Sequence, residues 1–168
     1  MKIIGTMRAQ DQDRGVVRVE DGPKPDIVRG LGATYHTSSV ADVARDHRPD
    51  VVIEGTGVGQ LVFDALAATG SYGVVCLTGL SSGGRTLGVD AGGLNREIVL
   101  ENDAVVGSVN ANLRHYEQAA RALAAADTDW LHRLITTRIP LADAAGAFER
   151  PAGRDVKVVI TLDDVATS

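Results

Sequence analysis

The sequence predicts an α/β fold built around a doubly wound, mostly parallel sheet, and two observations carry this prediction. Three apolar runs, at 51–54, 73–79 and 104–110, are nearly continuous rather than alternating, which is typical of strands covered on both faces. Segments with helical apolar spacing separate these runs, and strand-helix-strand order is typical of a parallel sheet. With 168 residues and no linker, charge block or repeat, the chain is expected to form a single domain over 1–168.

The segment before these runs is expected to add further strands and helices. Residues 1–6 are compatible with a strand. The patterns that follow predict, in order, a strand at 16–19, a helix at 26–31, a short strand at 33–35 and a helix at 40–47.

Two helices are predicted between the three apolar runs. Leu61, Phe63 and Leu66 give residues 59–69 an apolar helical face, and a shorter helical pattern covers 92–101. The unit of strand, helix and strand therefore repeats.

The longest predicted helix follows residue 110. Leu113, Tyr116, Ala120 and Leu123 recur there at helical spacing, and Asn112 is a suitable N-terminal cap. The remaining elements are a strand at 135–139, a short helix at 142–149 and a closing strand at 156–162. Between them, Trp130 is expected in a core or lid-packing cluster with its apolar neighbours, rather than as a platform for a sugar.

Composition excludes several classes of partner. The formal net charge is -5 with the two signs interspersed, so no cluster of Lys and Arg is available for a nucleic acid or an anionic membrane. A lone cysteine, Cys76, allows no internal disulfide, and no signal peptide or membrane-spanning apolar run is recognisable. The interpretation is a cytoplasmic protein.

A cluster of three glycines follows the apolar run at 51–54. The dinucleotide fingerprint needs glycines at its first, third and sixth positions, whereas Gly55, Gly57 and Gly59 fall at the first, third and fifth. The acidic residue expected about twenty positions on, for the ribose hydroxyls, is absent from 75–79. The cluster therefore fails as a pyrophosphate turn, and a flexible strand-to-helix connection is the alternative.

The first strand-helix unit of the fold is expected to be missing or replaced. Residues 7–15, which follow the strand-compatible start, offer neither the glycine pattern nor the length of a helical crossover. The glycine cluster nevertheless lies at the carboxyl end of a strand, as do the loops at 78–84 and 107–112. Open α/β sheets bind ligands at that edge, so these three loops predict a binding edge.

The run GVDAGGLNREIVLENDAVVGSVN at 88–110 resembles archaeal-type glucose dehydrogenases, which are zinc-dependent medium-chain alcohol dehydrogenases. The likeness extends from about Asp26 through LGATY at 31–35 and VVIEGTG at 51–57 to the C-terminal strand. It implies a Rossmann-like cofactor domain truncated at its N-terminus. In that family, hydride passes from the anomeric carbon of a sugar to NAD or NADP and a lactone forms, while a separate N-terminal domain holds the zinc and most sugar contacts.

The resemblance implies a set of cofactor-binding residues and no catalytic residue in this chain. The cofactor-binding set comprises Thr56, Gly57, Thr78, Gly79, Leu80, Ser108, Val109 and Asn110. Asn110 is also similar to an asparagine that binds a sugar hydroxyl, since an amide donates and accepts at once. Its alternative is an asparagine that bonds its own turn. Ser81 and Ser82 are either cofactor contacts or turn residues, and Arg18 is either a selector of NADP or a solvated side chain.

Zinc belongs to the family, but no ligand set for it is recognisable in this sequence. His36, His47, His115 and His132 are scattered and are expected at the surface or in helix caps, and Cys76 is expected to pack as a hydrophobic residue. The competing hypothesis is a catalytically silent remnant that acts as a binding or assembly module. The family likeness and an uncovered sheet edge also predict a homo-oligomer.

Overall fold

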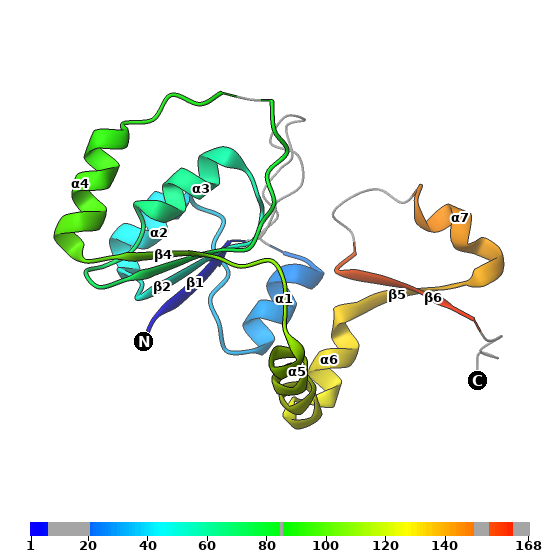
Figure 1. Cartoon of the computed structure of the whole chain (residues 1–168). Coiled ribbons are helices and arrows are strands. Elements are labelled where there is room, and N and C mark those ends of the chain that lie inside the picture. The colour runs from blue at the N-terminus through cyan, green and yellow to red at the C-terminus, as the bar shows by residue number, and fades with distance from the viewer. Residues whose placement is uncertain (7–20, 85, 150–154, 163–168) are drawn as a thin grey trace. The chain divides into compact units, whose positions relative to one another are not determined.

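The computed structural model describes residues 1–6, 21–84, 86–149 and 155–162. The chain divides into two compact units (Figure 1). Within the described residues, unit 1 contains 1–6 and 38–111, and unit 2 contains 21–37 and 112–162.

Unit 1 is built on a four-stranded parallel sheet. Its strands are β1 (Ile3–Thr6), β2 (Val51–Glu54), β3 (Val74–Leu77) and β4 (Ala104–Gly107), in the order β1-β2-β3-β4. The last residues of β2, β3 and β4 are in register, because Glu54 pairs with Leu77 and Leu77 pairs with Gly107. The carboxyl ends of β2, β3 and β4 therefore meet at one edge.

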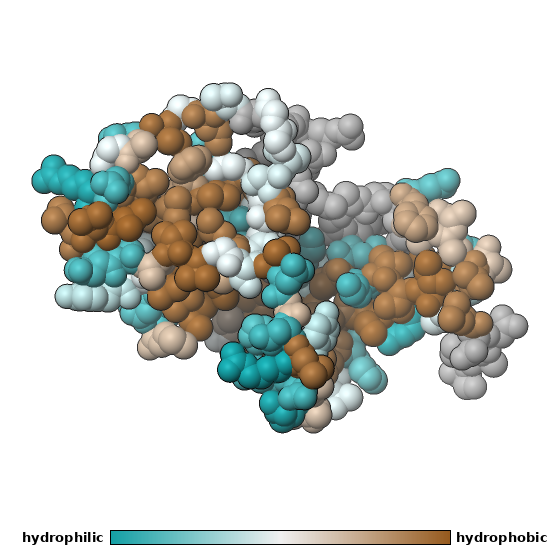
Figure 2. Space-filling model, viewed as in Figure 1, coloured by the Kyte–Doolittle hydropathy of each residue, from teal (hydrophilic) through white to brown (hydrophobic). Residues whose placement is uncertain are grey.

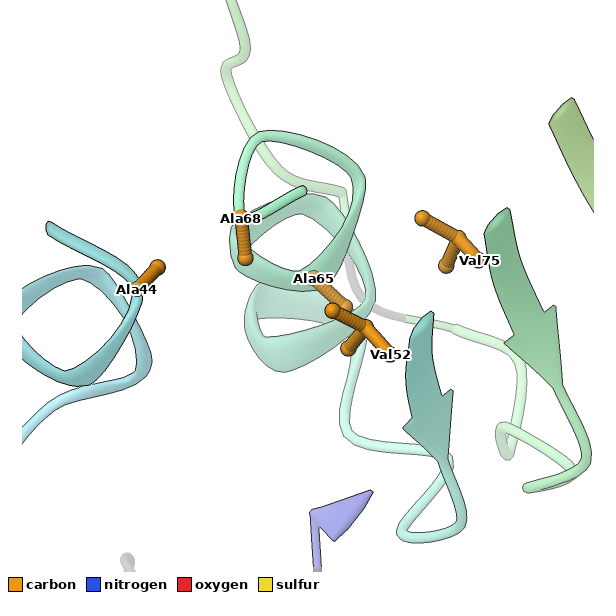
Figure 3. Packing of buried hydrophobic residues seen from close by; sticks show 5 residues of the cluster. All are labelled: Ala44, Val52, Ala65, Ala68 and Val75. Atoms are coloured by element: carbon orange, nitrogen blue, oxygen red, sulfur yellow. The ribbon is translucent and has the colours of Figure 1, made fainter. Parts of the chain in front are cut away.

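Two helices, α2 (Val40–His47) and α3 (Gly59–Leu66), pack together on the sheet. Figure 3 shows the small core, in which Ala65 of α3 lies next to Val52 of β2, and Ala44 of α2 points toward Ala68, which follows α3. Its buried members are Ala44, Val52, Ala65, Ala68 and Val75. Small side chains let the helices approach the sheet closely, and the apolar area that they remove from water stabilises this arrangement.

Helix α4 (Ala91–Glu101) leads into β4 and leaves apolar surface uncovered. The Asp90 side chain caps the helix by accepting from the Gly93 N–H at 2.9 Å. Figure 2 shows apolar side chains gathered over the region of α4 and β4. The exposed members are Val99, Leu100, Val105 and Val106.

The amino end of the sheet is closed by a carboxylate. Asp103 accepts hydrogen bonds from the Gly73 N–H at 2.9 Å and from the Thr69 hydroxyl at 3.0 Å. The Tyr72 N–H donates to the Glu101 carbonyl at 2.7 Å. These bonds hold the turn that precedes β3 against the end of α4.

Unit 2 combines helices with a two-stranded parallel sheet. Its elements are α1 (Pro23–Gly30), α5 (Leu113–Ala125), α6 (Thr128–Leu134), β5 (Ile135–Pro140), the 3-10 helix η2 (Leu141–Asp143), α7 (Ala144–Ala147) and β6 (Lys157–Thr161). Strand β5 pairs with β6. Trp130 joins α6 to α1, because its indole N–H donates to the Ile27 carbonyl at 3.1 Å. Trp130 thus takes part in a contact between two helices of unit 2.

Most predicted elements form, and the parallel α/β fold is confirmed. The strand predicted at 33–35 is wrong: no regular structure forms there. Helix α3 ends at Leu66 rather than at 69, and α6 was not predicted. Strand β1 is present, whereas the strand predicted at 16–19, Arg18 and the expected break in the first strand-helix unit at 7–15 lie outside the described residues.

Candidate functional site

The three predicted loops lie side by side at the carboxyl edge of the unit 1 sheet. The register places the residues after Glu54, Leu77 and Gly107 next to one another. Hydrogen bonds continue this order beyond the strands, because the Ser108 N–H donates to the Leu77 carbonyl at 3.0 Å. We call this edge the rim, defined as residues 55–58, 78–80 and 108–110.

Glu54, the last residue of β2, holds the first rim loop. Its side chain is fully buried, at 0% exposure. The carboxylate accepts from the Thr56 N–H at 2.7 Å and from the Thr56 hydroxyl at 2.5 Å, and its second oxygen accepts from the Gly57 N–H at 3.1 Å. Several donors thus satisfy the oxygens of this buried side chain, as burial of a polar group requires.

The main chain of the same residue holds the second rim loop. The Glu54 carbonyl accepts from the Thr78 N–H at 2.8 Å, from the Gly79 N–H at 3.1 Å and from the Thr78 hydroxyl at 3.0 Å. Glu54 therefore connects the loop after β2 with the loop after β3.

The two loops are in direct backbone contact at a pair of glycines. A Cβ on Gly57 would lie 2.3 Å from the Leu80 carbonyl oxygen, and a Cβ on Gly79 would lie 2.2 Å from the Gly57 nitrogen. Gly57 also has a φ of +68°, which favours glycine. Packing within the protein thus explains both glycines without a ligand.

Thr56 faces inward rather than toward solvent. Its exposure is 8%, and its hydroxyl donates to Glu54 while accepting from the Val58 N–H at 3.0 Å. Any role of Thr56 in binding would therefore depend on the position of the turn and not on its hydroxyl.

The rest of the rim presents a mixed surface to solvent. Leu80 is 80% exposed and Val109 is 68% exposed. Thr78, Ser108 and Asn110 are also exposed, and within the described residues the Asn110 side chain makes no hydrogen bond to its own turn. Apolar side chains next to polar groups suit a flat, polar-edged ring such as nicotinamide.

The phosphates and a metal fit this surface less well. The Gly57 N–H, which a phosphate turn would direct at its ligand, already donates to Glu54. Among the described residues, no group of three or more His, Cys, Asp or Glu side chains is placed to hold a metal ion. The residues present therefore fit the nicotinamide half of a dinucleotide, and they do not fit a catalytic zinc.

The other candidate residues fall in structural positions. His115 belongs to a helix cap: its Nδ1 accepts from the Asn112 N–H at 3.4 Å, while the Asn112 side chain accepts from the His115 N–H at 3.0 Å. This confirms the cap predicted for α5. Cys76 is half-buried within β3. Ser81 and Ser82 are exposed.

Sequence reasoning missed Glu54. The available signal was an acidic residue at the end of an otherwise apolar strand, directly before the glycines. A charged residue in that position must find donors inside the fold. The following turn supplies them.

Comparisons with known proteins show which proteins the chain is similar to. A protein-family model described as glucose dehydrogenase C-terminus matches residues 3–162. Glucose 1-dehydrogenase of Halobacterium salinarum is 42% identical over 151 residues, which are 87% of this chain and 42% of that protein. Glucose 1-dehydrogenase of Methanocella arvoryzae is 30% identical over 152 residues, which are 86% of this chain and 42% of that protein.

A solved structure shows the same fold. The glucose dehydrogenase of Haloferax mediterranei, in complex with NADP, Zn and gluconolactone, superimposes with a TM-score of 0.78 at 30% identity. The match covers 97% of this chain and 43% of that one. The chain thus spans about two fifths of the length of the relatives that it matches. Among the described residues, no helix is long and apolar enough to cross a membrane.

Proposed function

The chain belongs to the glucose dehydrogenase C-terminus family, and on that premise we propose that it is the cofactor-binding part of a glucose dehydrogenase-like oxidoreductase. Its task in that role is to bind NADP or NAD at the rim. The observation that carries the proposal is the alignment of three polar loops on one sheet edge. The Haloferax relative that binds NADP and gluconolactone supports the choice of ligand.

The rim would act by positioning. When bound, a nicotinamide dinucleotide accepts a hydride from the substrate. For this family the substrate is a sugar, and the hydride leaves from its anomeric carbon. Leu80 and Val109 would pack against the nicotinamide ring. The polar groups of Ser108 and Asn110 would form hydrogen bonds with the polar edge of the ring. Asn110 is the residue that we propose to reach a sugar hydroxyl. The part of the relatives that this chain does not cover would supply the remaining contacts.

Calorimetric titration of the chain with NADP, and separately with NAD, tests this function. We expect saturable binding of one dinucleotide per chain. Loss of one hydrogen bond in Asn110→Ala should weaken it about tenfold. Asn95→Ala is the matched control, because Asn95 is also exposed in unit 1 but lies on α4, away from the rim; its affinity should stay within about twofold. Equal affinities of the two variants would contradict the assignment of Asn110.

A catalytically silent binding or assembly module is the second candidate. The observation in its favour is that the Gly57 N–H, which a phosphate turn would direct at its ligand, donates to Glu54 instead. We would adopt it if neither dinucleotide binds. If NADP or NAD binds, the part of a relative that this chain does not cover can be added. Oxidation of a sugar by that mixture would support the dehydrogenase function.

We also propose that the chain forms a homo-oligomer through β4, in the cytoplasm. Strand β4 is an edge of the sheet, and Val105 and Val106 are 43% and 50% exposed. An exposed edge with apolar side chains favours pairing with a second copy. Sedimentation should give a dimer at micromolar concentration, and a monomer at the highest soluble concentration would count against this interface.

A further inference from the structure

The carboxylate of Glu54, the residue just before the rim loop 55–58, has no task in the proposed function. It is fully buried and cannot touch a ligand on the surface. It accepts from the Thr56 hydroxyl and from the N–H groups of Thr56 and Gly57. A buried carboxylate is costly unless the donors around it are fixed. Such a group therefore selects one conformation of the turn that surrounds it.

The turn that Glu54 fixes is in contact with the next rim loop. The Gly57 nitrogen and the Gly79 Cα are so close that a Cβ on Gly79 would come within 2.2 Å of that nitrogen. Moving Gly57 away from Gly79 would open the contact, and moving it toward Gly79 would make a clash. The position of Gly57 therefore determines how far apart the two loops lie.

We propose that Glu54 is a positioning residue, whose buried carboxylate sets the spacing of the 55–58 and 78–80 loops and thereby shapes the rim for a nicotinamide dinucleotide. The effect on dinucleotide binding rests on the proposed function. The spacing of the two loops is a property of the rim alone.

Thr56 transmits this effect. Its hydroxyl donates to Glu54 and accepts from the Val58 N–H, so it connects the carboxylate with the residue that precedes α3. Serine retains both bonds and valine retains neither. Thr56→Ser should therefore keep the spacing of the two loops, and Thr56→Val should change it as a Glu54 variant does.

A purely structural carboxylate is the alternative, and the chain provides a matched control. At the opposite end of the same sheet, Asp103 accepts from a threonine hydroxyl and from a glycine N–H, those of Thr69 and Gly73. Asp103→Asn and Glu54→Gln thus disturb equivalent bonds. Only Glu54→Gln disturbs them at the rim.

Hydrogen exchange of individual amides tests the spacing role without a ligand. In Glu54→Gln and Thr56→Val we expect the Gly57 and Gly79 amides to exchange at least about tenfold faster, while the amides of α3 stay unchanged. In Asp103→Asn the acceleration should appear at Gly73 instead. Unchanged exchange at Gly57 and Gly79, or equal acceleration in every element, would overturn the proposal.

Titration of the same folded variants with NADP tests the functional half. Affinity should fall about tenfold in Glu54→Gln and Thr56→Val, and stay within about twofold in Asp103→Asn. Undiminished affinity of Glu54→Gln would refute the link to binding. If the unchanged chain itself fails to bind NADP but exchange at the rim responds as expected, the proposed function fails and the spacing role stands.

Discussion

The two ends of the unit 1 sheet use the same chemistry to different effect. At the carboxyl end, Glu54 accepts from Thr56 and Gly57; at the amino end, Asp103 accepts from Thr69 and Gly73. In each case a carboxylate pairs with a threonine hydroxyl and with a glycine N–H. Each pair fixes a turn next to a strand.

What differs is the surface that each fixed turn supports. The amino-end turn is bonded to neighbouring chain on both sides, since the Gly70 N–H donates to Pro49 at 3.0 Å and the Tyr72 N–H donates to Glu101 at 2.7 Å. The amino-end turn exposes one large side chain, Tyr72, whereas the carboxyl-end turn borders loops that expose Leu80 and Val109. The comparison teaches that anchoring chemistry does not locate a site, whereas the direction of parallel strands does.

The largest expected effect comes from adding a methyl group at the carboxyl end. Gly79→Ala should lower the free energy of unfolding by about 3 kcal/mol, because the new Cβ meets fixed backbone that cannot yield. Urea unfolding followed by circular dichroism measures this.

The control for that substitution is Gly107→Ala. Gly107 ends the neighbouring strand, and a Cβ there meets nothing within 4 Å. Its unfolding free energy should stay within about 1 kcal/mol of the unchanged chain. Similar losses at the two positions would mean that the contact between the rim loops does not exist.

A smaller effect is expected at the amino end. Asp103→Asn should cost about 1 kcal/mol, because the half-buried carboxylate is replaced by an amide that can satisfy only one of its two donors as an acceptor. The urea midpoint should fall while the slope of the transition stays constant. A loss larger than that of Gly79→Ala would reverse the ranking of the two ends.

The smallest effect concerns an exposed carboxylate, Asp42 in the first turn of α2. Hydrogen bonds from the Ser39 hydroxyl at 2.6 Å, and after it from the Arg45 guanidinium at 3.1 Å, lower the pKa of Asp42. A lowered pKa in the folded state gives stability that is present above the pKa of the unfolded chain and is lost as pH falls through the folded value.

Ser39→Ala should therefore raise the pKa of Asp42 toward its ordinary value and reduce the acid dependence of stability. Titration of the Asp42 carboxyl by NMR measures the shift. A pKa that does not move would show that the Ser39 hydroxyl is not its main cause.

The sequence was sufficient for the elements whose signals are local. The cap of α5 at Asn112 and the strands β2, β3 and β4 follow from spacing and side-chain type alone. The strand expected at 33–35 failed because a short apolar stretch after Gly32, which has a φ of +74°, finds no strand to pair with among the described residues. Strand formation depends on a partner that local pattern does not specify.

The location of the site was predictable from the sequence, but the side-chain contacts that build it were not. The ends of apolar runs located the rim, since parallel strands carry their loops to one edge. The inward-facing hydroxyl of Thr56 and the buried carboxylate of Glu54 depend on contacts within 55–58 that pattern does not reveal. Helix α6 was missed because Trp130 suggested packing, although Asp127, which accepts from the Trp130 N–H at 3.2 Å, was a usable cap signal.

The central claim is that the carboxyl end of this sheet, and not the amino end, binds a nicotinamide dinucleotide. Mapping backbone amide shifts of the labelled chain during addition of NADP tests it most directly. We predict saturable shifts at 56–57, 78–80 and 108–110, with none at 69–73 or at Asp103. Shifts confined to 69–73, or a spectrum that NADP leaves unchanged, would contradict the claim.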